Sequence, residues 1–221
     1  MNTDSRYKPF VREIEAASGR FRASDVFVDT CHMMAADLWR RLCFGEARRK
    51  AEADYNATRE KFNAEEFNHI CKAGAALIEA LLADRHEFLG QCMNLFEATN
   101  KWNGQVLTPS SLAQLMGRIT APTEEEHGEL IRLHDPCCGA GVLLIDGAEE
   151  YRKSGHSQAN ICIVASDIDY RACDMTYIQL SLLGYAACVQ QVDALTLQAY
   201  GEARYTIGWF LHGFPMRRIA A

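Results

Sequence analysis

The sequence lacks any long apolar run, which excludes a protein that spans a membrane through an apolar helix. No stretch approaches the roughly 18 consecutive apolar residues that a membrane-spanning helix needs. The first twenty residues are polar and mixed in charge, so they do not form a secretory signal. With 48% hydrophobic and 24% charged residues, the chain can still bury a core. We therefore expect a cytoplasmic protein without a membrane span.

Metal-chelating spacings are also missing. The nine cysteines form no C-x-x-C pair, and the seven histidines form no H-E-x-x-H pattern. An odd number of cysteines without an export signal favours reduced thiols over a disulfide framework. We expect no metal site. For the adjacent Cys137 and Cys138 two interpretations stay open, either small packing residues or a reactive or metal-binding thiol.

An excess of positive charge is absent as well. Lysine and arginine number 23 against 29 acidic residues, for a formal net charge of −6. A protein that grips a polyanion alone is usually basic, because binding depends on neutralising phosphates. If DNA is a partner, the composition favours binding together with a second chain or subunit.

The residues that are present divide the chain into two parts. Residues 6–100 are rich in Ala, Glu, Arg, Lys and Leu, and their apolar spacing predicts four or five helices and no strands. The segment "TNKWNGQVLTPSS" then has the composition of a loop. We expect a helical domain over 1–100 and a second domain over 101–221.

The second part alternates short β-type runs with helical runs, which indicates parallel strands joined by crossover helices. The expected strands are 130–134, 160–166, 186–192 and 205–211. The expected helices are 110–118, 141–153, 170–183 and 195–201. The fold class is therefore α/β, with a helical bundle followed by a sheet of about four mainly parallel strands.

The segment "HDPCCGAGVLL" follows the first expected strand and opens a helix. Gly139 and Gly141 allow positive φ and let a ligand approach the backbone. The helix start offers free N–H groups, and Asp135 can accept a bond from a cationic amino group. Asp167 and Asp193 follow the next two strands, so carboxylates fall at three successive strand ends. Ligands bind at this edge of an open α/β sheet, where an acid can hold a ribose.

Four segments in order carry a family resemblance. "GQVLTPSSLAQLMGRI", "DPCCGAGVLL", "SDIDYRACDMTYIQLSLLGY" and "VDALTL" resemble motifs of the N6-adenine DNA methylase family, as in the modification subunits of type I restriction systems. The likeness covers about residues 100–197. It implies a partial Rossmann-like methyltransferase sheet and S-adenosylmethionine as the cofactor.

The resemblance also implies roles for single residues. The segment that lines the methionine end of the cofactor corresponds to Thr108 and Pro109, and the loop that faces the methionine to Asp135, Gly139 and Gly141. Asp167 corresponds to the acid that binds the cofactor's ribose, and Ile168 to the apolar residue that contacts its adenine. Asp193 corresponds to the residue that reads the adenine amino group. Ala140 stands where the family usually has Ser or Thr, and Leu107 where it usually has an aromatic residue.

The family's catalytic tetrapeptide, [ND]-P-P-[FYW], has no counterpart. Residues 1–221 contain no Pro-Pro pair, and the segment after the fourth expected strand reads "HGFPMRRIAA". The catalytic residues are therefore unknown. Two functions stay open: a reduced adenine-N6 DNA methyltransferase of a restriction-modification or mobile-element system, and an inactive module that senses the cofactor or binds other proteins. An open apolar edge strand at 205–211 would favour a homo-oligomer.

Overall fold

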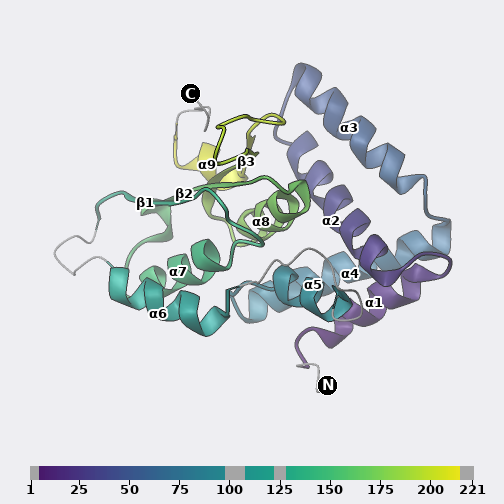
Figure 1. The fold of residues 1–221 in the computed structure, drawn as a ribbon, viewed down its shortest axis with the longest axis horizontal. Coiled ribbons are helices and arrows are strands. Elements are labelled where there is room, and N and C mark those ends of the chain that lie inside the picture. Colours follow the sequence, from purple (N-terminus) through teal and green to yellow (C-terminus); the bar gives the residue numbers. More distant parts are fainter. Residues whose placement is uncertain (1–4, 98–107, 122–127, 215–221) are drawn as a thin grey trace. The chain divides into compact units, whose positions relative to one another are not determined.

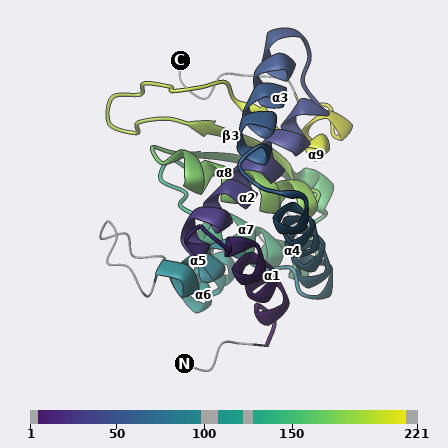
Figure 2. The ribbon, with the colours of Figure 1, turned by 90° about the vertical axis from the view of Figure 1, so that its right-hand side faces the viewer.

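The computed structural model describes residues 5–97, 108–121 and 128–214. By their internal contacts, residues 1–84 and 88–105 form one compact unit, and residues 85–87 and 106–221 form another. No helix in the described ranges is long and apolar enough to cross a membrane. Figures 1 and 2 show the chain as a ribbon in two orientations.

The first unit consists of helices only in its described part. These are α1 (Lys8–Ser18), α2 (Ala23–Arg40), α3 (Gly45–Arg59), α4 (Ala64–Ala83) and α5 (Leu89–Glu97). Helix α1 packs along α4, and α2 packs along α3. The start of α4 is fixed by a capping box, in which Asn63 accepts the N–H groups of Glu65 and Glu66. The five helices agree with the four or five predicted from the sequence.

Aromatic rings form the centre of this helical unit. The ring of Phe10 lies 6.0 Å from that of Phe27 and 5.6 Å from that of Phe88, both edge to face. All three side chains are almost completely buried. Such pairs stabilise a core beyond the area that they bury, so these rings tie α1 and α2 to the segment that leads into α5.

The second unit contains a sheet in the order β1-β2-β3-β4. Strands β1 (Ile131–Asp135), β2 (Ile161–Asp167) and β3 (Ala186–Gln191) are parallel, while β4 (Arg204–Tyr205) is antiparallel to β3. The predicted sheet of about four mainly parallel strands is confirmed. Strand β1 lies at one end, and its outer edge pairs with no strand of the described ranges.

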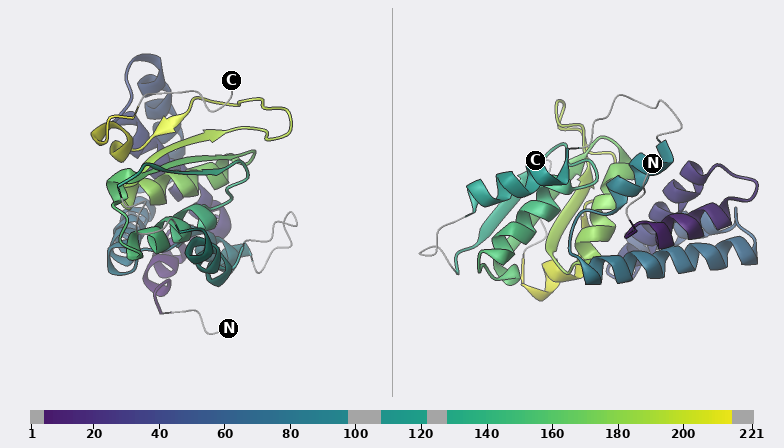
Figure 3. Two further views of the ribbon diagram at one scale, coloured as in Figure 1. Left: turned by 90° about the vertical axis from the view of Figure 1, so that its left-hand side faces the viewer. Right: turned by 90° about the horizontal axis from the view of Figure 1, so that it is seen from below.

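Three helices accompany the parallel strands: α6 (Ser110–Thr120), α7 (Val142–Lys153) and α8 (Tyr170–Leu182), with a short 3₁₀ turn at Gln158–Asn160 before β2. Because β1, β2 and β3 follow one another in one direction, right-handed crossovers place α7 and α8 on the same face of the sheet. Figures 1 and 3 show this arrangement, with α6 alongside α7. Because the strands are parallel, the loops that follow β1 and β2 lie at one edge of the sheet.

Close helix packing fixes α6 against α7. A Cβ atom at Gly117 would lie 2.9 Å from the Cα of Gly147, closer than real atoms approach. Arg118 of α6 also donates to Glu150 of α7 over 2.7 Å. The small residue at 117 therefore sets the distance between the two helices.

Two predictions for the end of the chain are wrong. The run 205–211 is not a strand: β4 covers only Arg204–Tyr205, and α9 (Ile207–Leu211) follows. A short apolar run fits either a strand or a buried helix. Here the helix is favoured by Gly208, whose missing Cβ would lie 2.7 Å from the carbonyl carbon of Tyr185. The apolar edge strand that favoured oligomers is therefore absent, and Trp209 is buried.

The helix expected at 195–201 is absent too. Asp193 forms a turn instead, in which its carboxylate accepts the N–H groups of Leu195 and Thr196. Val192 then pairs with Ala199 in an isolated antiparallel bridge. Asp competes with helical bonds in this way through its own side chain.

Candidate functional site

The glycine loop between β1 and α7 is shaped by its two glycines. Gly139 has φ 53° and Gly141 has φ 89°, both in the left-handed region that favours glycine. A Cβ at Gly141 would also lie 2.9 Å from the hydroxyl of Thr176. The positive φ and the contact with Thr176 both disfavour any side chain at position 141. The loop backbone can therefore turn sharply into the start of α7.

Asp167 at the end of β2 holds this loop. Its Oδ2 accepts the N–H of Gly139 at 2.9 Å, and its Oδ1 accepts the N–H of Asp169 at 2.9 Å. A further bond joins the N–H of Cys138 to the carbonyl of Ser166 at 2.9 Å. With 8% of its surface exposed, Asp167 is mostly buried. Each carboxylate oxygen has a second lone pair, so Asp167 keeps acceptor capacity for a ligand.

The other two strand-end acids are arranged differently. Asp135 accepts the N–H of Cys137 at 3.0 Å and is partly exposed. Asp193 accepts the N–H of Leu195 at 2.8 Å, and this bond, with those of Thr196, holds the pKa of its carboxyl below the usual range. Asp193 is therefore ionised at neutral pH. One bond, from the N–H of Val192 to the carbonyl of Asp167 at 2.9 Å, places Asp193 next to the end of β2.

Ile168 and the Thr108–Pro109 segment complete the predicted set. Ile168 is 57% exposed on the turn between β2 and α8, as a contact to a flat apolar ring requires. Pro109 is the N-cap residue of α6. The next residue, Ser110, donates to Asp146 of α7, so α6 begins beside the first turns of α7. The structure thus brings Asp135, Gly139, Gly141, Asp167, Ile168 and Asp193 to one sheet edge.

The structure adds polar residues that the sequence patterns did not single out. Thr176 and Gln179 of α8 donate to the carbonyls of Gly139 and Ala140 at 2.9 and 3.0 Å. Glu87 accepts from Gln179 at 3.3 Å, and the N–H of Glu87 donates to Asp146 at 2.8 Å. The available signal was a Thr and a Gln inside the otherwise apolar run "MTYIQL".

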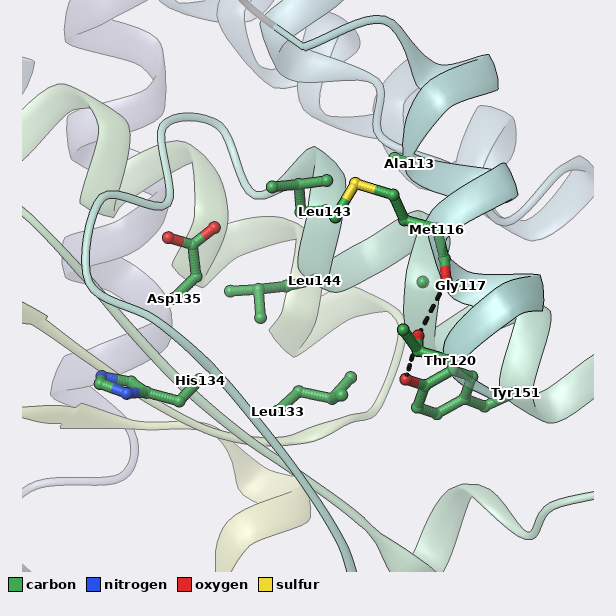
Figure 4. A pocket seen from close by; sticks show the side chains of 11 residues that line it. Ala113, Met116, Gly117, Thr120, Leu133, His134, Asp135, Leu143, Leu144 and Tyr151 are labelled. Carbon is green, nitrogen blue, oxygen red and sulfur yellow. Dashed lines mark hydrogen bonds between the residues drawn. The ribbon is translucent and has the colours of Figure 1, made fainter. Parts of the chain in front are cut away.

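A pocket of about 400 Å³ adjoins Asp135 on the side of α6. Figure 4 shows the Asp135 carboxylate at one end and the hydroxyls of Thr120 and Tyr151, which are hydrogen-bonded to each other, at the other. Between these ends lie mainly apolar side chains, and the complete lining is Ala113, Met116, Gly117, Thr120, Leu133, His134, Asp135, Leu143, Leu144, Gly147 and Tyr151. A small, mostly apolar group would fit there.

The cysteines of the loop have different surroundings. Cys138 is buried, and burial raises the pKa of its thiol well above the usual value, so it is inert at neutral pH. Cys137 is exposed. Across the described ranges, no group of three His, Cys, Asp or Glu side chains is placed to hold a metal ion.

Known proteins are similar to this chain over part of its length. The family model "N-6 DNA Methylase" matches residues 79–202. The methylase subunit of the type I restriction enzyme MjaVIII from Methanocaldococcus jannaschii is 32% identical over 87 residues, which are 39% of this chain and 13% of that subunit. The chain thus matches only a small part of this longer relative.

Two solved structures match this chain at low sequence identity. A putative class I S-adenosylmethionine-dependent methyltransferase from Listeria monocytogenes matches with a TM-score of 0.48 and 12% identity, over 85% of this chain and 53% of that one. The type I restriction-modification methyltransferase subunit from Streptococcus thermophilus matches with a TM-score of 0.48 and 13% identity, over 86% and 58%. The chain spans little more than half of either protein.

The family assignment depends on the family model, which covers the glycine loop, all three strand-end acids and α8. These are the segments that carried the resemblance in the sequence. Because the matched residues make up more than half of the 221, the chain belongs to the N-6 DNA methylase family.

Proposed function

We propose that the second unit binds S-adenosylmethionine at the carboxyl edge of β1, β2 and β3. The observation that carries this proposal is the glycine loop held by Asp167, with Asp135 and Asp193 at the neighbouring strand ends. Asp167 would bind the ribose, and Ile168 would cover the adenine. Asp193 would accept a hydrogen bond from the amino group of that adenine. Thr108, Pro109, Asp135 and the start of α7 would surround the methionine end.

The cofactor would supply a methyl group bound to a sulfonium, which an adenine amino group can attack. That amine is a weak nucleophile because its lone pair is delocalised into the ring. In the family an Asn or Asp beside two prolines accepts its hydrogen bonds, and residues 1–221 contain no such tetrapeptide. We therefore propose that this chain is the cofactor-binding part of an adenine-N6 DNA methyltransferase and that a second chain completes the site.

An inactive, cofactor-sensing module is the second candidate. The observation in its favour is that the segment after β3 leads to β4 and α9, with Trp209 packed 5.2 Å from Tyr205 and 5.3 Å from Phe214. These rings pack against one another in tilted pairs. They are thus occupied in packing, and residues 204–214 contain no Asn, Gln, Asp or Glu that could act as the acceptor.

One experiment separates the two candidates. Purified residues 1–221 are incubated with cofactor tritiated in the methyl group and with mixed-sequence DNA at low salt, and bound and transferred counts are both measured. We expect binding without transfer for this chain alone. Transfer well above that of a Gly141→Asp control would contradict the need for a second chain. Transfer that begins only when a partner subunit is added would exclude the inactive module.

We also propose that the chain forms a homo-oligomer. The edge strand that first favoured this is absent, but another surface supports it. The outer edge of β1 pairs with no strand of the described ranges, and α6 exposes four apolar side chains at helical spacing: Leu112, Leu115, Met116 and Ile119. Open edges and exposed apolar stripes are usually covered.

The nine cysteines are all free, which fits a reducing compartment such as the cytoplasm.

A further inference from the structure

Two buried polar side chains of α8 control how the glycine loop presents its peptide groups. We propose that Thr176 and Gln179 are positioning residues that set the affinity of the loop for the amino-acid end of S-adenosylmethionine. This inference rests on the proposed function, because it assumes that the loop binds that cofactor. Both side chains are completely buried. They act through the backbone of the loop and do not touch the ligand.

Thr176 fixes the first of two peptide groups. Its hydroxyl donates to the carbonyl of Gly139 at 2.9 Å, and the thiol of Cys138 lies 3.7 Å from the same hydroxyl. A side chain at Gly141 would collide with Thr176. The loop and α8 therefore fit each other closely at this point, and the direction of the Gly139 carbonyl is determined by α8.

Gln179 fixes the second peptide group. Its Nε2 lies 3.0 Å from the carbonyl oxygen of Ala140, 3.2 Å from that of Met175 and 3.3 Å from Oε1 of Glu87. All three neighbours are oxygen acceptors, so only the donating end of the amide can face them. The side-chain orientation follows from this chemistry, and the amide nitrogen of Gln179 faces the loop carbonyl.

The consequence lies on the opposite side of the loop. In a trans peptide the N–H points away from the preceding carbonyl. With the carbonyl of Gly139 turned to Thr176, the N–H of Ala140 points away from α8, and within the described residues it has no acceptor. Ala140 precedes the start of α7, whose first N–H groups also lack a side-chain cap. The loop thus offers donors suited to a carboxylate, and α8 keeps its carbonyls turned away.

The test compares two ligands. S-Adenosylmethionine carries the amino-acid end, and 5′-methylthioadenosine has the same nucleoside without it. Dissociation constants are measured by calorimetry for the wild type and for Thr176→Val, which keeps the shape and removes the donor. We expect Thr176→Val to weaken binding of S-adenosylmethionine roughly three- to tenfold, as for the loss of one neutral hydrogen bond, and to leave binding of 5′-methylthioadenosine within twofold. Thr176→Ser should restore the wild-type ratio.

Further variants separate positioning from folding. Gln179→Met removes the second donor and should give the same selective loss, so the test stands if Thr176→Val does not fold. Ser181→Ala removes a hydroxyl of the same helix that makes no hydrogen bond within the described residues, and should change neither constant. Equal constants in all variants, or equal losses for both ligands, would overturn the positioning role alone. A wild type that binds neither ligand would overturn the proposed function and this inference with it.

Discussion

At the scale of single residues, Asp167 has two roles that share one carboxylate. It accepts two backbone N–H groups that hold the glycine loop and the turn after β2. It is also the acid that we propose for the cofactor's ribose. A buried donor that loses its acceptor costs roughly 1–3 kcal/mol. Substitution should therefore affect stability even without a ligand.

Asp167→Ala is expected to lower the free energy of unfolding by about 1–3 kcal/mol and to weaken S-adenosylmethionine binding about tenfold or more, since bonds to a charged group contribute roughly 1.5–3 kcal/mol. Thermal melts and calorimetry would measure both. The control is Asp169→Asn, because Asp169 caps α8 and Asn caps equally well. Unchanged cofactor affinity in a folded Asp167→Ala protein would exclude the ribose role.

Asp146 predicts a pH dependence of stability. Burial raises the pKa of its carboxyl, although Ser110 and the N–H of Glu87 donate to it. A raised pKa means that its favourable contribution is present below 3.8, its ordinary value, and is lost as pH rises through the folded pKa. Asp146→Asn cannot ionise, and its Oδ1 can still accept from Glu87.

The Asp146→Asn protein should therefore gain stability relative to the wild type as pH rises from 3.5 to 7, by about 1.4 kcal/mol for each unit of pKa shift. Melting temperatures across that range would show it. Asp25→Asn, at an exposed aspartate, is the control. A relative stability that falls over the same range would show that burial does not dominate at this site.

At the scale of elements, the helices and the parallel strands were predictable because their signals are long and repeated. Strands β1, β2 and β3 and helices α6, α7 and α8 agree with the predicted ranges to within about two residues. The strand-end acids followed from the same pattern, because parallel strands end at one edge. Short elements were different. The apolar run 205–211 is compatible with either a strand or a helix. The close packing of Gly208 on the Tyr185 backbone is a tertiary contact that the sequence pattern does not show.

The glycine pair between α6 and α7 gives a matched test of packing. Gly117→Ala would place a methyl group 2.9 Å from the Cα of Gly147, so the helices must separate. We expect a loss of about 1–3 kcal/mol in the free energy of unfolding, the usual cost of overpacking. In Gly147→Ala no atom lies within 4 Å of the new Cβ, and residue 147 lines the pocket. This substitution should therefore be neutral, or should stabilise the protein by up to about 1 kcal/mol. Equal effects in denaturant titrations would contradict the close contact.

The polar contacts of α8 could not be predicted. That Thr176 and Gln179 face the glycine loop depends on how α8 packs against β2 and β3, and spacing alone does not specify this. Gln179 was visible only as an amide within an apolar run. Tertiary contacts of this kind decide the fine structure of the site, while the strand ends decide where it lies.

At the scale of the whole molecule, the proposed homo-oligomer predicts a concentration-dependent mass. Sedimentation at tens of micromolar should show a species larger than the 24.8 kDa monomer. Leu115→Glu with Ile119→Glu places charges on the exposed stripe of α6 and should shift the protein to the monomer without lowering its melting temperature. The matched control is Leu82→Glu with Ile78→Glu, at exposed positions on α4. A monomeric wild type would contradict the proposal.

The most direct test of the central claim is calorimetric titration of residues 1–221 with S-adenosylmethionine. We predict saturable binding with one site per chain, and a rise in melting temperature that grows with ligand concentration, because a ligand that binds only the folded state stabilises it. Binding should be lost in Gly141→Asp, whose side chain would collide with Thr176. If the folded wild type gives neither heat nor a melting shift with millimolar ligand, the glycine loop and its three acids do not form a cofactor site.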